Sequence, residues 1–268
     1  MHSVMLTREQ ASLARQNNYI IDQRFVSGNI IEYDIRQANI NILYKYGIID
    51  GKKYNYLKNL PKDNREVIVG NMIKSDKEIY KTINTGIKEA KLKLFDANSI
   101  NEYEVIRIAN DAVYVNRMGN LKVTKFDNIE FVPKSVSNCF LKLNQLLFFI
   151  EFKNNINVDI KGLGNDYEIH EPLVSIIVNI VNELYCVGVK QAMGSLNNFI
   201  DDYINRRLDV GYYRELTPGG SFRIIGGEFF ISNPPYLYKE IDTGYNLFIL
   251  RELSSILYEI YTSTYRNL

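Results

Sequence analysis

Two aspartates stand at points of the sequence where a carboxylate could do chemistry. Asp34 closes a run of strand-forming residues that starts at Ile30, and a helical pattern begins within a few residues. Asp111 stands at a turn between two β-branched runs within 105–115. A strand end and the tip of a nearby hairpin can meet at one sheet edge. Two carboxylates there provide the hard oxygen ligands that Mg²⁺ or Mn²⁺ prefers, so we expect Asp34 and Asp111 to hold such a metal ion.

The segment between the two aspartates is basic and helical in pattern. We predict one helix over 64–74, capped by its first residue, and a second from about 76 to 94. Arg65 and Lys74 are nine residues apart, which puts them on roughly opposite faces of one continuous helix at about 3.6 residues per turn. Lys88 follows on the second helix.

Other signals place these residues in a sheet-and-helix framework. Thr7 and Gln10 form a capping-box pattern at the start of a helix predicted over 7–18. The residues after Asp34 predict a helix over 38–46, and Gly47 ends it. Helices and strands are therefore mixed along the first half of the chain.

The second half has a β-rich part followed by a helical part. Alternating apolar residues predict several strands within 119–168. The elements predicted next are a helix over 173–189 that Pro172 opens near its first position, a helix over 190–208, a hairpin over 222–231 and a final helix over 245–261. We therefore expect an α+β fold with a domain at 1–135 and a second, β-rich and then helical, region at 136–268.

Composition excludes several classes of protein. The chain has 268 residues, of which 46% are hydrophobic, so it should fold rather than remain disordered. Its two histidines and two cysteines are too few for a usual structural zinc site or a disulfide framework, and reduced thiols favour the cytoplasm. No apolar run approaches the length of a membrane span. The asparagine, isoleucine and tyrosine usage is typical of an AT-rich genome, so we expect a phage or low-GC bacterial source.

The order of these motifs resembles that of nucleic-acid polymerase palm domains. Residues 33–43, Tyr-Asp-Ile-Arg-Gln-Ala-Asn-Ile-Asn-Ile-Leu, look like motif A of DNA polymerases. Residues 105–115, Val-Ile-Arg-Ile-Ala-Asn-Asp-Ala-Val-Tyr-Val, look like motif C and are similar to the Arg-Tyr-Ala-Asp-Asp hairpin of reverse transcriptases. The segment from Arg65 to Lys74 would be the counterpart of the fingers helix. The resemblance covers about 28–118, under half of the chain.

The resemblance implies a palm-like antiparallel sheet with helices and a role for each charged residue. Asp34 and Asp111 would be catalytic metal ligands for Mg²⁺ or Mn²⁺, and Arg65 and Lys74 would contact a nucleotide triphosphate. We add Lys88 as a substrate-binding residue. The implied function is that of a nucleotidyltransferase, a small phage-type DNA polymerase or polymerase-like subunit, acting on primer-template and nucleotides. The C-terminal region would serve as a thumb or dock a protein partner.

The same residues also fit ordinary structural roles. Asn-Asp is a favoured turn sequence, so Asp111 could serve the turn alone. Asp34 could cap the following helix, and Arg65 and the lysines could form a solvated helix face. The alternative function is therefore a non-enzymatic component of a phage replication or transcription assembly that binds nucleic acid or another protein.

Overall fold

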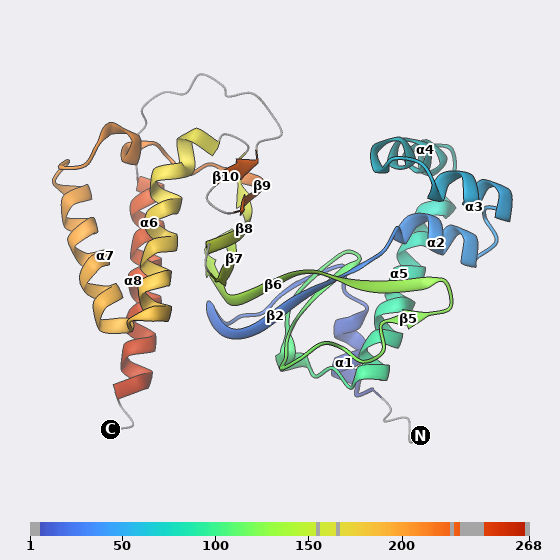
Figure 1. The fold of residues 1–268 in the computed structure, drawn as a ribbon, viewed down its shortest axis with the longest axis horizontal. Helices are drawn as coiled ribbons and strands as arrows, with labels where there is room; N and C mark the ends of the chain where they lie inside the picture. Colours follow the sequence, from blue (N-terminus) through green and yellow to red (C-terminus); the bar gives the residue numbers. More distant parts are fainter. Residues whose placement is uncertain (1–5, 154–155, 165–166, 226–227, 231–243, 266–268) are drawn as a thin grey trace. The chain divides into compact units, whose positions relative to one another are not determined.

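The computed structural model describes residues 6–153, 156–164, 167–225, 228–230 and 244–265 (Figure 1). The chain divides into two compact units. Unit 1 consists of the residues up to Asp22 together with Gly28–Val136, and unit 2 consists of Gln23–Ser27 together with the residues from Ser137 onward. Both units contain helices and antiparallel strands, which confirms the α+β prediction.

Unit 1 contains the strands that carry both aspartates. The order of its neighbouring strands is β1 (Asn18–Ile20), β3 (Val105–Ala109), β4 (Ala112–Asn116) and β2 (Phe25–Ile35). All three of these pairings are antiparallel. The first part of β6 (Ile129–Leu143) lies beside β2 and also pairs with the short β5 (Lys125–Phe126). The hairpin predicted over 105–115 is therefore confirmed as β3 and β4.

The helices of unit 1 are α1 (Arg8–Ala14), α2 (Ala38–Lys45), α3 (Gly51–Lys58), α4 (Lys62–Ser75) and α5 (Lys77–Asn98). The predicted capping box at Thr7 and Gln10 is present, and Asp76 caps α5. The helix predicted from Asn64 starts earlier, after Pro61, so Asn64 is not its cap. Helix α3 was not predicted, because its mostly polar sequence lacks a clear apolar stripe.

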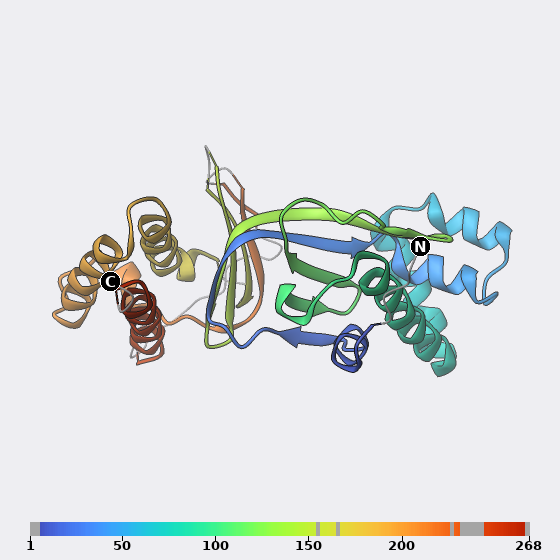
Figure 2. The ribbon, with the colours of Figure 1, turned by 90° about the horizontal axis from the view of Figure 1, so that it is seen from below.

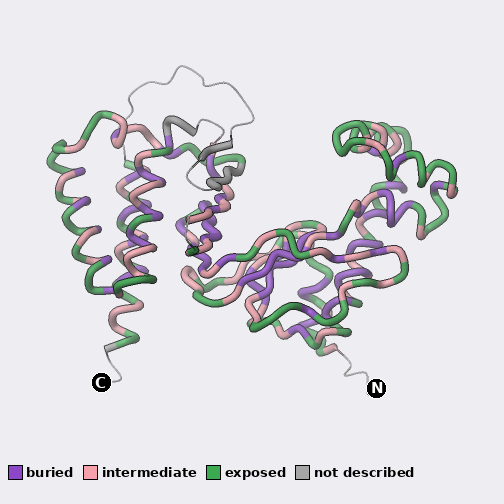
Figure 3. The backbone as a smooth tube through the Cα atoms, in the orientation of Figure 1, coloured by how far each residue is buried: buried purple, intermediate pink, exposed green. Residues whose placement is uncertain are grey.

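Helix α5 anchors the core of unit 1. Its apolar residues recur at helical spacing and are buried among residues of β2, β3 and β4; they are Ile79, Ile83, Ile87, Ala90 and Leu94. Helix α1 packs beside α5, which the two perpendicular views show (Figures 1 and 2). By contrast, α4 is mostly exposed (Figure 3). The strands that carry the aspartates therefore rest on a well-packed helix.

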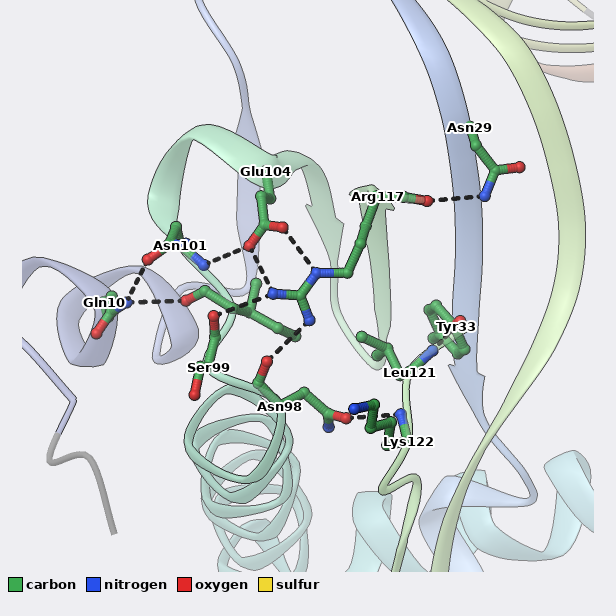
Figure 4. Close-up of polar contacts among 11 residues, drawn as sticks. Gln10, Asn29, Tyr33, Asn98, Ser99, Asn101, Glu104, Arg117, Leu121 and Lys122 are labelled. Carbon is green, nitrogen blue, oxygen red and sulfur yellow. Dashed lines mark hydrogen bonds and ion pairs between the residues drawn. The ribbon is translucent and has the colours of Figure 1, made fainter. Parts of the chain in front are cut away.

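The carboxyl end of α5 is fixed by Arg117, which follows β4 (Figure 4). Its guanidinium donates to the carbonyl oxygens of Asn98 at 2.8 Å and Ser99 at 3.2 Å. It also pairs with both carboxylate oxygens of Glu104, at 2.7 and 3.2 Å. Glu104 belongs to η1 (Glu102–Glu104), the short helix that leads into β3. A cation at a helix carboxyl end satisfies carbonyl groups that have no partner within the helix.

Unit 2 contains antiparallel strands and three long helices. The strand order is β6, β7 (Leu146–Phe152), β8 (Ile156–Leu163), β9 (Pro218–Ile225) and β10 (Glu228–Phe230), all paired antiparallel. The helices are α6 (Tyr167–Cys186), α7 (Val189–Ile204) and α8 (Gly244–Tyr265), with η2 (Val210–Tyr213) between the last two. Helices α6, α7 and α8 pack together (Figure 1).

Some element boundaries in unit 2 differ from the predicted ones. Helix α6 begins at Tyr167, so Pro172 lies inside the helix rather than at its first position. A proline inside a helix removes one backbone hydrogen bond, and the packed apolar residues of α6 outweigh that loss. The hairpin predicted over 222–231 is present as β9 and β10, but its Gly226-Gly227 turn lies outside the described residues. Among the described helices, none has the length and apolar character that a membrane crossing requires.

Candidate functional site

A pocket of about 470 Å³ in unit 1 contains both predicted aspartates. It lies where β2 ends, and α2, α4, the β3–β4 turn and β6 complete its wall. The residues that line this Asp34–Asp111 pocket are Asp34–Ile40, Lys62, Arg65, Glu66, Val69, Asp111, Val132 and Lys134. Charged side chains of both signs therefore face a single hollow.

Strand pairing brings Asp34 and Asp111 together. Asp34 is paired with Ala112 across β2 and β4, and Asp111 immediately precedes that partner. The backbone N–H of Ile35 donates to the carbonyl oxygen of Asp111 at 3.3 Å. Asn110 adopts a left-handed conformation, with φ of 50°, that the tight turn requires. Asp34 and Asp111 are distant in the sequence, and they meet where the neighbouring strands β2 and β4 end and begin. The sequence had predicted that a strand end and a hairpin tip could bring them together.

The charge of Asp34 acts on the Asp111 carboxylate. Burial raises the pKa of Asp111 above its ordinary value, and the negative charge of Asp34 raises it further. The charges of Lys134 and Lys91 oppose this rise only in part. A carboxylate whose charge is disfavoured by a neighbouring carboxylate gains stability from any cation that binds between them.

Glu32 and Lys134 belong to the same site, and sequence reasoning missed both. The Lys134 ammonium lies 3.2 Å from Glu32 Oε1 and 3.2 Å from Asp34 Oδ2. Only 2% of Glu32 is exposed, and Ser135 Oγ donates to it at 2.8 Å. Burial alone would raise the pKa of Glu32, but the hydrogen bonds from Ser135 and Tyr114 and the charge of Lys134 outweigh it and lower the pKa. Glu32 is thus a buried, ionised anchor for Lys134.

The sequence held a signal for Glu32 but none for Lys134. Glu32 precedes Asp34 by two residues, and side chains two apart on a strand share one face of the sheet. Lys134 comes from β6, and its register against β2 depends on long-range pairing that local patterns do not specify. Burial acts on Lys134 by lowering its pKa, whereas the two carboxylates raise it and prevail. Lys134 is therefore a resident counter-ion of the site.

The three predicted substrate-binding cations fall in different places. Arg65 lines the pocket, half-buried, and donates to the carbonyl oxygen of Leu60 at 3.4 Å. Lys74 is exposed in the last turn of α4, and Lys88 lies on α5; neither is among the pocket-lining residues of the described chain. Because α4 runs unbroken from Lys62 to Ser75, Arg65 and Lys74 lie on opposite faces, as the helix period requires.

Two further cations line the pocket with acidic partners at its rim. Arg36 forms an ion pair with Glu130 at 3.2 Å, and its side chain is 62% exposed. Lys62 lies 3.6 Å from Glu66, one turn along α4. Such exposed pairs contribute little to stability, so their cations can turn toward an incoming anion at small cost.

Lys91 supports the turn that carries Asp111 from below. It is fully buried, and its Nζ donates to the carbonyl oxygens of Asn110, at 3.0 Å, and of Gln16. Burial lowers the pKa of Lys91 to about 8, the neighbouring Lys88 acts in the same direction, and Asp111 opposes them. Lys91 thus places a positive charge next to the Asp111 turn and holds the turn through the Asn110 carbonyl oxygen.

Asp34 and Asp111 are the two aspartates of the pocket that could hold a metal ion. Among the described residues, no group of three or more His, Cys, Asp or Glu side chains is arranged to hold a metal ion. Mg²⁺ typically binds through one or two carboxylates and completes its shell with water and substrate phosphates. Asp34 and Asp111 could form such a pair, although Lys134 occupies one oxygen of Asp34, and Glu32 is engaged by both Lys134 and Ser135.

Comparison with known proteins identifies one family. The family described as "Bacteriophage PBS1 gene 130 protein" matches residues 9–257, which is most of the chain and includes both units. A search of curated proteins finds no match. The match supports the phage source that the composition indicated. The chain belongs to the bacteriophage PBS1 gene 130 protein family.

Proposed function

We propose that the Asp34–Asp111 pocket performs divalent-metal-dependent nucleotidyl transfer, and that the protein acts as a small DNA polymerase or polymerase-like subunit. The observation that carries the proposal is the meeting of Asp34 and Asp111 beside Arg65 in one polar pocket. The charge of Asp34 raises the pKa of Asp111, which favours a bound cation, and an arginine beside them suits a phosphate. These are the needs of a reaction in which a primer 3′-hydroxyl attacks the α-phosphate of a nucleotide and pyrophosphate leaves.

The carboxylates of Asp34 and Asp111 would hold Mg²⁺ or Mn²⁺. When bound, such an ion stabilises the negative charge that develops on a transferred phosphate. Burial at the β3–β4 turn keeps the Asp111 carboxylate in a fixed position, and Lys91 reinforces it from behind. The protein would thus supply a preorganised pair of ligands rather than a flexible one.

The cations and the start of α2 would bind the phosphates of the incoming nucleotide. Arg65 and Lys62 reach the pocket from α4. Ala38 and Asn39 begin α2, whose first turn contains no acidic residue and whose cap residue Gln37 makes no side-chain capping bond. The backbone N–H groups of such a turn are donors that favour a negatively charged partner.

Lys134 would change partners when a metal ion binds. In the structure its ammonium forms ion pairs with both Asp34 and Glu32. A divalent ion on Asp34 would repel this ammonium, and buried Glu32 would retain it. Lys134 would then remain available as a further cation toward the substrate.

The resident Lys134 also favours a second candidate function. It already forms an ion pair with Asp34, so this carboxylate has a cationic partner without a metal ion. That arrangement suits a palm-like scaffold that serves a replication or transcription assembly by binding nucleic acid or protein, without catalysis.

Primer extension separates the two functions. The full chain is incubated with labelled primer-template, all four deoxynucleotides and Mg²⁺ or Mn²⁺, beside Asp34→Asn and Asp111→Asn. Asp127→Asn is the matched control, since Asp127 also occupies a turn, with φ of 54°, but is not among the pocket-lining residues of the described chain. Extension by the wild type and the control, and its loss in both pocket variants, supports the proposal. Absence of extension by the wild type with either metal favours the binding role.

A further inference from the structure

An exposed aromatic stack lies on α2 and α3, outside the pocket wall. The rings of Tyr44 and Tyr54 are stacked, with centroids 4.4 Å apart and planes inclined by 19°. Tyr44 is 42% exposed, although most large aromatic side chains are buried when structure alone requires them. The Lys58 ammonium lies over the Tyr54 ring, 5.6 Å from its centroid. We call Tyr44, Tyr54 and Lys58 the tyrosine stack.

Hydrogen bonds tie the tyrosine stack to the pocket. The Tyr54 hydroxyl donates to Asn41 Oδ1 at 2.8 Å, and the Asn41 amide donates to the carbonyl oxygen of Arg36 at 2.6 Å. Gln37 Nε2 donates to the carbonyl oxygen of Lys58 at 3.3 Å. Arg36 and Gln37 both line the pocket. The stack is therefore fixed relative to the pocket and lies next to its rim.

The surface around the stack is basic. Helix α3 contains three exposed lysines, Lys52, Lys53 and Lys58, and no acidic residue. Asp50, which precedes α3, is engaged as its cap and accepts from the backbone N–H of Lys53. Lys58 is one turn from Tyr54 and shares its face of α3, whereas Lys52 and Tyr56 lie on roughly the opposite face. Positive charge beside an exposed aromatic ring suits a polyanion whose units have flat faces.

We propose that the tyrosine stack binds single-stranded nucleic acid, with a base seated against the exposed Tyr44 ring and the phosphates beside Lys53 and Lys58 of α3. Stacking on tyrosine is available to every base, and lysines along the backbone complete the pattern of single-strand binding without sequence preference. The inference deepens the proposed function, on which it rests, by naming the strand that runs beside the pocket. Lysine charge on this surface disfavours a purely apolar partner.

Fluorescence anisotropy tests the inference without any catalytic step. A labelled single-stranded oligonucleotide is titrated with the full chain in EDTA, using wild type, Tyr44→Ala, Tyr44→Phe and Tyr103→Ala. Tyr103 is the matched control, because it is 71% exposed on η1 and is not among the pocket-lining residues of the described chain. Far-UV circular dichroism establishes that each variant is folded.

The expected result follows from the loss of one base stack. Tyr44→Ala weakens binding at least about fivefold, which corresponds to the lower end of base–aromatic stacking, about 1 kcal/mol. Tyr44→Phe and Tyr103→Ala retain wild-type affinity, because phenylalanine preserves the ring and Tyr103 lies elsewhere. Lys58→Gln, titrated at several salt concentrations, makes the negative slope of log affinity against log salt shallower by about 0.7. The loss of one phosphate contact has this effect on binding to a single strand.

The outcomes separate this inference from the proposed function. Equal affinity of wild type and Tyr44→Ala, or no binding by the wild type, overturns the inference whether or not primer extension occurs. Weakened binding in Tyr44→Ala together with unchanged binding in Tyr103→Ala supports it. If that binding pattern appears while the wild type extends no primer, the tyrosine stack stands and the catalytic proposal falls.

Discussion

Lys91 gives the most quantitative prediction, because its charge is buried beneath the Asp111 turn. Its side chain is fully buried, and its pKa falls from 10.5 to about 8 on folding, mainly through burial. Between these two pKa values the unfolded chain binds more protons than the folded chain, so folding stability rises with pH across that window. One unit of pKa corresponds to about 1.36 kcal/mol, so burial of the charged form costs about 3 kcal/mol in full.

Most of this cost is relieved within an accessible pH range. For pKa values of 10.5 and about 8, the contribution of Lys91 to stability increases by about 2 kcal/mol between pH 7 and pH 9.5. The substitution Lys91→Met removes the titrating group. It also leaves the carbonyl oxygens of Asn110 and Gln16 without that donor, which costs about the same at every pH.

Urea denaturation at several pH values measures the effect. The difference in unfolding free energy between wild type and Lys91→Met should shift by about 2 kcal/mol in favour of the wild type from pH 7 to pH 9.5. Lys122→Met, at an exposed lysine, is the control and should run parallel to the wild type. Parallel curves for wild type and Lys91→Met would refute the assignment of a buried, charged Lys91.

Three other substitutions test the framework. Arg117→Met should destabilise unit 1 by about 2–4 kcal/mol in urea denaturation, because it breaks the ion pair with Glu104; an unchanged midpoint would contradict this. Lys134→Met should cost about 1–3 kcal/mol at pH 7, since Glu32 loses its cation, and adding Glu32→Gln should recover most of the loss. Gly162→Ala should lower the melting temperature of unit 2, because the added Cβ falls 2.2 Å from a backbone oxygen at φ of 91°. An unchanged melting temperature would contradict this and would mean that the backbone shifts to make room for the Cβ.

Local patterns predicted the elements that carry the site. The capping box at Thr7, the apolar stripe of α5 and the β3–β4 hairpin each depend on neighbouring residues, so sequence alone was enough. The juxtaposition of Asp34 and Asp111 followed from the same signals, because the end of a strand and the tip of a hairpin can lie side by side when the strands pair. Asn64 was wrong as a cap because Pro61 starts the helix earlier.

The parts that escaped sequence analysis depend on long-range pairing. Lys134 meets Glu32 and Asp34 only because β6 lies beside β2, and nothing near residue 134 encodes that partner. The tyrosine stack joins Tyr44 of α2 to Tyr54 of α3. Helix α3 was not predicted, because its polar sequence has no helical periodicity of apolar residues. At Pro172 a local signal was overridden by tertiary packing. Proline usually lies in the first turn of a helix, but α6 begins five residues earlier, at Tyr167.

The most direct test of the central claim is primer extension by the full chain with Mg²⁺ or Mn²⁺, comparing wild type with Asp111→Asn and Asp127→Asn. The account predicts metal-dependent extension by the wild type and by Asp127→Asn, with loss of at least about 100-fold in Asp111→Asn, the scale expected when a preorganised charge is removed from a phosphate-transfer site. Extension by Asp111→Asn at the wild-type rate, or no extension by the wild type with either metal, would contradict it.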